Sequence, residues 1–370
     1  MSERFSTPSS TAPRSTQVTI RDVARLANVS QATAARAMGG YGYVSEARRR
    51  RVEQAAEELG YRPNDIARAL ASGSTKTIGL IVGDIENPFF ATLARGVADV
   101  VESEGYTLLL ANSDENIERE QRAVEAFRTR LVEGIIIAPV TGSDSSHLRQ
   151  GGWPVVCVDR SIRGVDVDTV TVTNARGARI AVEHLLSLGH RRIGVVTDSA
   201  EIPSTAQRLR GYRTALRNAG IEVDEDLISV APLSTLSGGH AAARDLLERR
   251  DRVRAVFTTS NFMTAGTVRA LRELDLRMPD DVALVAFDDL EWTTIVEPPI
   301  TVIAQPVLEI GTVAGQRILA RVAGDTSPAQ QIRLPTELVV RGSCGEPPDD
   351  LSRDRGRRAP ARTSLAGSRA

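Results

Sequence analysis

Cysteine and lysine are almost absent from this sequence of 370 residues. Two cysteines, Cys157 and Cys344, cannot supply a disulfide framework, and so few thiols fit a reducing cytoplasm. Lys76 is the one lysine, and we attribute the excess of arginine to genome composition rather than to function. Because no run of about 18 consecutive apolar residues occurs, we predict no membrane-spanning helix.

Sequence signatures of the common enzyme classes are also missing. There is no Gly-rich phosphate-binding loop, no cluster of metal ligands at ordered spacing and no GxSxG elbow around a nucleophilic serine. The histidines are scattered through the chain, at His147, His184, His190 and His240. We therefore predict a protein that is not an enzyme and that carries no cofactor or metal.

The N-terminal residues are rich in serine, threonine and proline. They lack the apolar core of a signal peptide, so we predict a disordered tail over residues 1–17, and a second one over residues 343–370. The second tail has no leucine heptad and therefore no predicted coiled coil. The sequence is 41% hydrophobic and 25% charged, as in soluble globular proteins, and its length predicts two or three domains.

The net charge of −1 hides an uneven distribution. Residues 1–76 contain 12 Lys+Arg and 7 Asp+Glu, a charge of +5, whereas the remainder contains 34 and 40, a charge of −6. A positive segment on an otherwise acidic chain is the electrostatic pattern of a nucleic-acid-binding domain. The N-terminal segment is therefore the candidate DNA-binding part.

Residues 18–62 predict three short helices. Thr19, with Asp22 three residues later, forms a capping-box-like start, and apolar side chains then recur with helical spacing. After a two-residue break, Ser30 is placed to cap a second helix, predicted over residues 31–38. Two helices joined by so tight a turn form a helix-turn-helix, whose second helix enters the DNA major groove.

The second helix is predicted to turn Gln31, Ala32 and Arg36 outward. A glutamine pairs with adenine, an arginine with guanine or a phosphate, and an alanine methyl contacts a thymine methyl. The alternative is an ordinary helical hairpin with a solvated polar face. A third helix, predicted over residues 46–59 with Ser45 as its cap, carries a basic run beside the recognition helix and favours DNA binding.

Residues 63–76 predict a turn followed by a short hinge helix. Asn64 is placed to cap that helix, and Ile66 and Leu70 lie four residues apart on one face. A helix this short is only marginally stable in water and needs a partner. Its own copy in a dimer, DNA, or both would supply that partner.

From about Thr19 to Gly342 the sequence resembles the LacI-type (LacI/GalR, lactose-repressor) family of bacterial transcriptional regulators. The most specific stretches are TIRDVARLANVSQATAARAM, VSEARRRRVEQAAEELGYRPN and the hinge ARALASG. The resemblance implies that Leu70 wedges into the minor groove at the operator centre, where apolar wedges bend the duplex. The DNA-binding residues that it implies are Thr19, Ser30, Gln31, Ala32, Thr33, Arg36, Tyr43, Asn64, Ala67 and Leu70.

Two pairs of residues depart from the family pattern. Ala34 and Ala35 stand where Val-Ser is usual, which removes a hydroxyl contact to phosphate, and Gly39 and Gly40 stand where an asparagine is common. Both departures bear on DNA affinity more than on the fold. They motivate an alternative function, a sugar- or nucleoside-binding module whose headpiece has weakened DNA binding.

From residue 77 onward, short apolar runs alternate with amphipathic segments. The first series predicts strands at 78–82, 106–111, 134–138 and 154–158 and helices at 89–104 and 117–130. The second predicts strands at 192–197, 255–258 and 282–286 and helices at 175–188, 207–219 and 263–274. A crossover at 301–305, a helix at 308–322 and a final strand pair at 331–340 follow. This alternation predicts parallel sheets with helices on both faces, in two lobes separated by a cleft.

The resemblance implies a small all-α headpiece followed by a two-lobe, periplasmic-binding-protein-like α/β domain over residues 77–342. It implies discontinuous lobes, near 77–173 with 304–330 and near 174–303 with 331–342. A periplasmic sugar-binding protein shares such a body, but it would carry a signal peptide and no headpiece.

Ligands of open α/β sheets bind beyond the carboxyl ends of the strands, so the residues there are candidates for an effector site. A carboxylate at such an end more often caps the next helix, and we give that role to Asp198 and Asp289. The resemblance implies effector binding by Phe89, Phe90, Asp159, Arg160, Arg208, Asn261 and Asp288. Phe262 departs from the pattern, because an aspartate usually follows that asparagine.

An arginine fork or a carboxylate takes paired hydroxyls, and an aromatic face covers the apolar side of a sugar ring. Such a cleft suits a neutral polyol, above all a monosaccharide or small glycoside, with a nucleoside as the alternative. The expected partners are a double-stranded DNA operator, a small-molecule effector and a second copy in a homodimer. We expect a cytoplasmic protein, nucleoid-associated when bound to DNA, in which effector binding changes lobe closure and hinge spacing.

Overall fold

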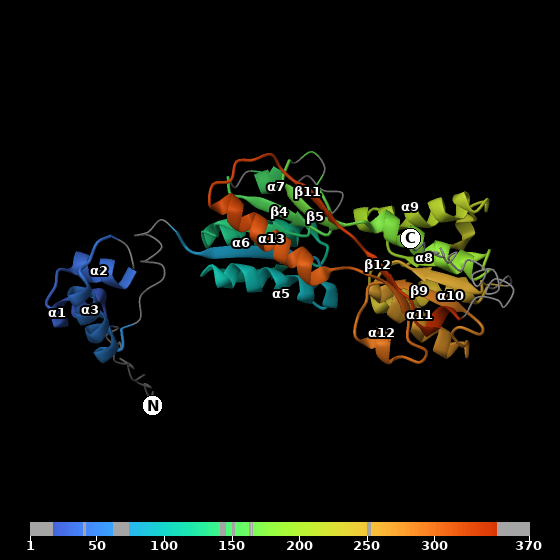
Figure 1. The fold of residues 1–370 in the computed structure, drawn as a ribbon, viewed down its shortest axis with the longest axis horizontal. Coiled ribbons are helices and arrows are strands. Elements are labelled where there is room, and N and C mark those ends of the chain that lie inside the picture. The colour runs from blue at the N-terminus through green and yellow to red at the C-terminus, as the bar shows by residue number, and fades with distance from the viewer. Residues whose placement is uncertain are drawn as a thin grey trace, which may run out of the picture. The chain divides into compact units, whose positions relative to one another are not determined.

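The computed structural model describes residues 18–39, 42–61, 74–140, 146–149, 152–162, 164, 166–249 and 253–345. The chain divides into two compact units, Met1–Lys76 and Thr77–Ala370 (Figure 1). The predicted hinge helix and the predicted N-terminal tail lie outside the described residues. The predicted C-terminal tail begins too early, because Ser343 and Cys344 are buried in a short helix over Gly342–Cys344, and the tail from residue 346 lies outside the described residues. No helix within these ranges is long and apolar enough to cross a membrane.

The first unit contains the helices α1 (Ile20–Leu26), α2 (Gln31–Gly39) and α3 (Glu46–Glu58), close to the predicted bounds. Two of the predicted caps form. The Thr19 amide donates to the Asp22 carboxylate at 3.0 Å, and the Thr33 amide donates to the Ser30 hydroxyl at 3.1 Å. Ser45 occupies the N-cap position of α3, but its hydroxyl makes no capping bond.

Small apolar side chains form the core of this headpiece. The buried residues are Val23, Ala24, Ala27, Ala34, Ala37, Val52, Ala55 and Ala56. Six of these eight are alanines, so the three helices approach closely and bury little apolar area per residue. Ala34 is fully buried, so this departure from the family pattern lies in the core rather than on the outer face of α2.

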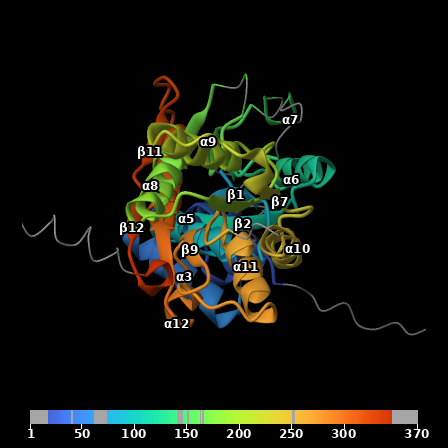
Figure 2. The ribbon, with the colours of Figure 1, turned by 90° about the vertical axis from the view of Figure 1, so that its right-hand side faces the viewer.

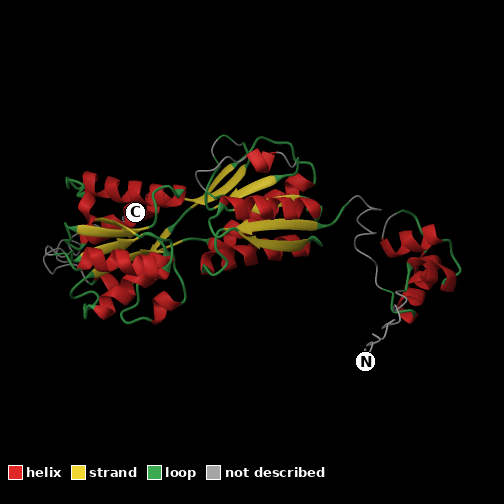
Figure 3. Cartoon of the chain, turned by 180° about the vertical axis from the view of Figure 1, so that it is seen from behind, coloured by secondary structure: helices red, strands yellow, loops and turns green. Residues whose placement is uncertain are grey.

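The second unit contains two six-stranded sheets covered by helices on both faces (Figures 1 and 3). The first sheet has the order β11-β5-β4-β3-β1-β2 and is parallel throughout. Its strands are β1 (Thr77–Val82), β2 (Thr107–Asn112), β3 (Gly134–Ile137), β4 (Val155–Val158), β5 (Asp168–Val172) and β11 (Gln331–Leu334). One face packs on α5 (Pro88–Ser103) and α13 (Val307–Val322), and the other on α6 (Ile117–Thr129) and α7 (Ser146–Arg149).

The second sheet has the order β12-β10-β9-β8-β6-β7, with β12 antiparallel to β10. Its strands are β6 (Ile193–Thr197), β7 (Ile228–Val230), β8 (Ala255–Thr258), β9 (Ala283–Phe287), β10 (Thr301–Ala304) and β12 (Glu337–Val339). One face packs on α8 (Asn174–Ser187) and α9 (Pro203–Asn218), and the other on α10 (Leu236–Leu247) and α11 (Asn261–Glu273) (Figure 2). The short helices are α12 (Trp292–Ile295), η1 (Glu225–Leu227) and η2 (Gly342–Cys344).

Burial on both faces explains why the strands read as continuous apolar runs. In β1, Ile78 and Leu80 pack beneath α5 and α13, whereas Ile81 packs on the opposite face with Phe127 of α6. All three isoleucine and leucine side chains are fully buried. Parallel sheets sandwiched between helices require this pattern, and the predicted fold class is therefore confirmed.

The chain passes between the two sheets three times, after β5, after β10 and after β11. The predicted final strand pair is wrong, because β11 pairs with β5 of the first sheet while β12 pairs with β10 of the second. One extended run therefore serves both lobes, with Pro335 and Thr336 between its two strands. The predicted lobe boundary near residue 330 moves to about residue 334 for the same reason.

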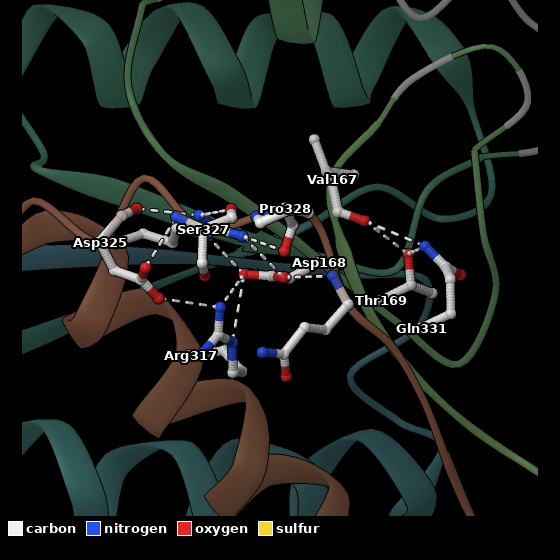
Figure 4. A network of polar contacts seen from close by, with 10 residues as sticks. Val167, Asp168, Thr169, Arg317, Asp325, Ser327, Pro328 and Gln331 are labelled. Atoms are coloured by element: carbon white, nitrogen blue, oxygen red, sulfur yellow. Dashed lines mark hydrogen bonds and ion pairs between the residues drawn. The ribbon is translucent and has the colours of Figure 1, made fainter.

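Asp168, the first residue of β5, fastens α13 and the segment before β11 to the first sheet (Figure 4). Its buried carboxylate accepts hydrogen bonds from Arg317 at 3.0 and 3.2 Å, from Arg321 at 2.7 and 3.1 Å, and from the Gln330 amide at 2.7 Å. Burial alone would raise the pKa of the Asp168 carboxyl, but these hydrogen bonds hold its pKa below the usual range. Arg317 also pairs with Asp325, at 3.2 Å.

Candidate functional site

A cleft of about 650 Å³ lies at the carboxyl ends of the strands of both sheets. The first lobe lines it with Gly83, Asp84, Asn112, Asp159 and Arg160, and the second with Asp198, Ser260, Asp288 and Gln305. Each of these residues follows or ends a strand, so the rule for open α/β sheets located the site. Its volume is in the range of small-molecule sites.

Arg208 is fixed on the floor of the second lobe, in the first half of α9. Its Nε donates to Asn174 Oδ1 at 2.8 Å, and its Nη1 donates to the Thr259 carbonyl at 2.6 Å. The guanidinium carbon lies 3.8 Å from the ring centre of Phe287, which orients the plane of the guanidinium. Among the described residues its Nη2 has no hydrogen-bond partner, so a rigidly held donor is available to a ligand.

Asp288 lies in the second lobe, directly after β9. It adopts a left-handed backbone, with φ of 81°, and its carboxylate accepts from the Asn261 amide at 3.0 Å and from the Gln305 side chain. Burial raises the pKa of the Asp288 carboxyl, and the Arg208 guanidinium opposes that rise. Asp288 and Arg208 together form a buried pair of opposite charge, which suits paired hydroxyl groups better than a net charge.

Arg160 is already paired with protein carboxylates. It donates to Asp159 Oδ2 at 2.9 Å and makes a two-pronged ion pair with Glu115, at 2.8 and 3.0 Å. Burial alone would lower the pKa of the Arg160 guanidinium, but Asp159 and Glu115 raise it above its usual value. The prediction of Arg160 as a direct effector ligand did not anticipate this ion pair.

Aromatic rings from the two lobes contribute the apolar part of the lining. Phe89 and Phe90, at the start of α5, meet edge to face with ring centres 5.1 Å apart. Phe262, at the start of α11, belongs to the opposite lobe and also lines the cleft. The cleft thus offers ring surfaces beside the charged pairs, which is the combination expected for a polyol with one apolar face.

A direct hydrogen bond joins the lobes beside the cleft. Asn261 Nδ2 donates to Asn87 Oδ1 at 2.8 Å, and the same Asn87 oxygen caps α5 by accepting from the Phe89 amide at 3.0 Å. The side-chain amide of Asn261, a predicted effector residue, is therefore already hydrogen-bonded to the opposite lobe. Asn261 is buried and is not among the residues that line the cleft.

Asp198 and Ser260 place buried polar atoms in the cleft. Asp198 Oδ1 and Ser260 Oγ are buried and lack a close, well-aligned hydrogen bond within the described residues. Burial raises the pKa of the Asp198 carboxyl above its usual value, and the neighbouring Ser260, Arg208 and Ser234 oppose that rise. The helix cap expected from Asp198 is wrong, because the cap position of α9 is Ile202. Asp289 has a structural role instead, bonded to Thr293 at 3.1 Å and to Arg341 at 2.8 Å.

Three cleft residues were missed by the sequence analysis as ligand candidates. Glu115 follows the end of β2 by three residues, Gln305 follows β10, and Asp198 follows β6. The strand-end rule, applied to every strand without exception, would have found all three. The pairing between Glu115 and Arg160 had no signal in the sequence, because 45 residues separate them.

The headpiece exposes most of the predicted DNA-binding side chains. Gln31, Ala32 and Arg36 lie on the exposed face of α2, opposite the buried Ala37. Tyr43 is 91% exposed, in the loop before α3. The remaining described candidates, Thr19 and Ser30, are exposed, and Thr33 is half-buried. The candidates Asn64, Ala67 and Leu70 lie outside the described residues.

The sequence matches known families over both units. Residues 19–64 match the family described as bacterial regulatory proteins, lacI family, and residues 182–344 match the periplasmic binding protein-like domain. The ribose operon repressor of Escherichia coli is 34% identical over 328 residues, which is 88% of this chain and 99% of the repressor. The chain belongs to the lacI family.

Solved structures agree with this assignment. The complex of the transcriptional regulator CelR with cellobiose is 33% identical, covers 88% of this chain and 99% of that one, and has a TM-score of 0.68. The lac repressor dimer bound to its operator and an anti-inducer is 25% identical, covers 89% and 99%, and has a TM-score of 0.79. These lacI-family relatives are transcription regulators rather than enzymes.

Proposed function

We propose that this protein is a sequence-specific transcriptional repressor that binds a palindromic operator as a homodimer and responds to a neutral sugar in the cleft. The observation that carries the proposal is that one chain joins two sites. One is the face of α2 that exposes Gln31, Ala32 and Arg36, and the other is a polar cleft between two α/β lobes. The first suits DNA and the second suits a small polyol.

Direct base reading is assigned to the exposed face of α2. Gln31 and Ala32 stand in its first turn, where a recognition helix meets base edges, and Arg36 stands just over one turn later. The basic run of α3 adds attraction for phosphates, which positions the headpiece without reading sequence. Tyr43, fully accessible at the edge of the same unit, is assigned a phosphate or sugar contact.

Exposed sheet edges support a homodimer. Each lobe ends in an exposed edge strand, β2 in the first sheet and β7 in the second. Leu110 on β2 is 45% exposed, and Val230 on β7 is 52% exposed. Apolar edges of this kind are normally covered by a partner. A two-fold dimer also presents two headpieces with the symmetry of a palindrome.

A neutral sugar is the effector class that the cleft supports best. Arg208 and Asp288 offer a fixed donor and acceptor for vicinal hydroxyls, and the phenylalanine rings offer an apolar face. Two of the relatives carry sugars in their names, ribose for the operon repressor and cellobiose for CelR. A nucleoside is the second class, because the same ring surfaces would stack on a base.

Coupling between the sites requires that effector and DNA prefer different closures of the two lobes. The bond between Asn87 and Asn261 and the three crossing segments are the elements that lobe movement would disturb. An inducer must bind the DNA-incompetent closure more tightly, and a corepressor the other one. Reciprocity then obliges DNA to change effector affinity by the same factor.

Footprinting of the purified protein on the DNA upstream of its own gene, at fixed salt, tests the proposal. We expect a protected palindrome whose protection one member of a panel of sugars and nucleosides abolishes or strengthens. Arg208→Ala should keep the footprint and lose the response to that compound. No protection under any condition would refute operator binding and leave the alternative, a ligand-binding module with a weakened headpiece.

A further inference from the structure

The loop between β2 and α6 carries a carboxylate into the cleft. Glu115 engages both terminal nitrogens of Arg160, at 2.8 and 3.0 Å, while Asp159 engages Nε of the same guanidinium at 2.9 Å. The Arg160 side chain is only 5% exposed, whereas that of Glu115 is 34% exposed. Glu115 therefore lies between the solvent-accessible cleft and a buried cation.

The backbone is arranged specifically to hold Glu115 there. Asp114 and Glu115 both adopt left-handed conformations, with φ of 48° and 52°, which are unfavourable for residues with a side chain. Opposite them, Gly83 directly follows the first strand, and a Cβ at Gly83 would overlap the Glu115 carboxylate. A strained loop and a glycine-sized gap thus meet at one ion pair, as at functional sites.

The charge of Glu115 changes how well the buried Arg160 is neutralised. Without it, Arg160 would be balanced by Asp159 alone, and one face of the guanidinium fork would be open to a carboxylate or phosphate. With it, two carboxylates face one cation. Arg208, the other cleft arginine, lies beside Asp288, and Asp198 adds a further buried carboxylate. Asp84, Glu86 and Asp114 line the cleft as well, so its carboxylates outnumber its two arginines and an anionic ligand meets an excess of negative charge.

We propose that Glu115 is a specificity-determining residue that reserves this cleft for uncharged ligands by occupying the anion-binding fork of Arg160. This inference rests on the proposed function of the cleft as an effector site and names the charge of the effector. Removing the Glu115 carboxylate should convert the cleft into one that accepts anions, such as phosphorylated sugars or sugar acids. The change requires no new residue, since the arginines are already in place.

The test uses the full-length protein, isothermal titration calorimetry and two kinds of probe. Inorganic phosphate reports anion binding without reference to any effector. D-ribose with D-ribose 5-phosphate, and D-glucose with D-gluconate, compare neutral and anionic forms of similar size. Glu115→Gln removes the charge with little change in volume. Gly83→Ala keeps the charge but displaces the carboxylate, which is the flexible end of a side chain and can move away.

Glu86→Gln is the matched control. Glu86 also lines the cleft and is exposed, and its carboxylate pairs with neither cleft arginine, so the variant removes the same charge without opening the Arg160 fork. We expect Glu115→Gln and Gly83→Ala to raise affinity for inorganic phosphate and for the anionic sugars by roughly tenfold or more over the wild type. Comparison with the wild type subtracts phosphate bound by the basic headpiece.

Three results would overturn the proposal: tight anion binding by the wild type, no gain in Glu115→Gln, or an equal gain in Glu86→Gln. The proposed sugar response fails separately. If no sugar or nucleoside affects DNA binding while Glu115→Gln gains phosphate and Glu86→Gln does not, the charge filter stands and the effector assignment falls. If a neutral sugar releases DNA but Glu115→Gln binds phosphate no better than the wild type, the effector assignment stands and the role of Glu115 is refuted.

Discussion

Replacing Asp168 by asparagine changes the side chain little in size, but it should destabilise the two-lobe unit strongly. Five hydrogen bonds converge on the Asp168 carboxylate, four of them from two guanidinium groups. Asparagine would turn an amide group towards those donors and leave two partly buried cations without their shared anion. Removing one partner of a buried ion pair costs about 3–5 kcal/mol. Because Arg317 and Arg321 are each 15% exposed, we expect a loss of about 3 kcal/mol, at the lower end.

Asp325→Asn supplies the control for that magnitude. Asp325 contacts the same Arg317 at 3.2 Å, but its side chain is 29% exposed and its loss leaves Asp168 in place. We expect a cost of about 1 kcal/mol or less, as for an exposed pair. Urea unfolding followed by tryptophan fluorescence is the assay, because Trp153 and Trp292 both lie in the two-lobe unit and the headpiece has none.

The stabilisation by Asp168 should also depend on pH. The pKa of the Asp168 carboxyl is lower in the folded protein than its unfolded value of about 3.9. Its stabilising contribution is therefore complete above about pH 4 and is lost as the pH falls through the lower, folded pKa. Asp168→Asn should flatten the acid limb of the stability curve. Equal losses for Asp168→Asn and Asp325→Asn, or an unchanged acid limb, would refute this account of the network.

Three further predictions concern the headpiece, the link between lobes and the dimer. Arg36→Ala should weaken specific operator binding by about 1–3 kcal/mol and leave non-specific binding nearly unchanged, and an unaltered ratio of the two affinities in gel-shift titrations would remove its base contact. Asn87→Ala should lower the free energy of unfolding by about 2 kcal/mol, and Asn116→Ala by about 1 kcal/mol. Both variants lose a helix cap, but only Asn87 also bonds to Asn261 of the other lobe. Equal losses in urea unfolding would show that this bond between the lobes contributes nothing to stability. Leu110→Asp should shift sedimentation from dimer to monomer without unfolding the chain, because that side chain is already half exposed, and a retained dimer would exclude β2 from the interface.

The sequence predicted the fold class because the physics of the strands is local. Runs such as Ile78 to Val82 must be buried on both faces, and the helices between them carry one apolar stripe. The headpiece followed from caps at Thr19 and Ser30 and from the helical spacing of its apolar residues. The beginning of α9 was placed four residues late, because Pro203 is a natural first helical residue but resembles a helix breaker in sequence.

Pairing between distant segments could not be predicted in the same way. Nothing in residues 331–340 distinguishes two consecutive strands of one sheet from one run divided between two sheets, since both are extended and partly exposed. The helix α10 was missed because two glycines, Gly238 and Gly239, weaken its helical signal. Both are needed for close packing, since a Cβ there would meet backbone atoms of neighbouring segments. The ion pair of Glu115 and Arg160 is likewise a property of the folded cleft alone.

Most of the residues that the resemblance assigns to the effector site line the cleft, but the resemblance did not predict which of their polar groups are already hydrogen-bonded. Arg208 and Asp288 lie where the resemblance implied, each held by further protein contacts. Asn261, in contrast, bridges to the other lobe, and Arg160 is occupied by two carboxylates. These differences bear on affinity and selectivity, which depend on which polar groups remain unpaired rather than on residue identity.

Energetic coupling between the headpiece and the cleft is tested most directly by reciprocal titration. Operator affinity would be measured with and without saturating effector, and effector affinity with and without saturating operator, both at one salt concentration. We expect affinity to change by the same factor in the two experiments, and we expect Arg208→Ala to abolish that change while retaining operator affinity. Effector binding that is indifferent to operator DNA would contradict this coupling and leave two independent sites on one chain.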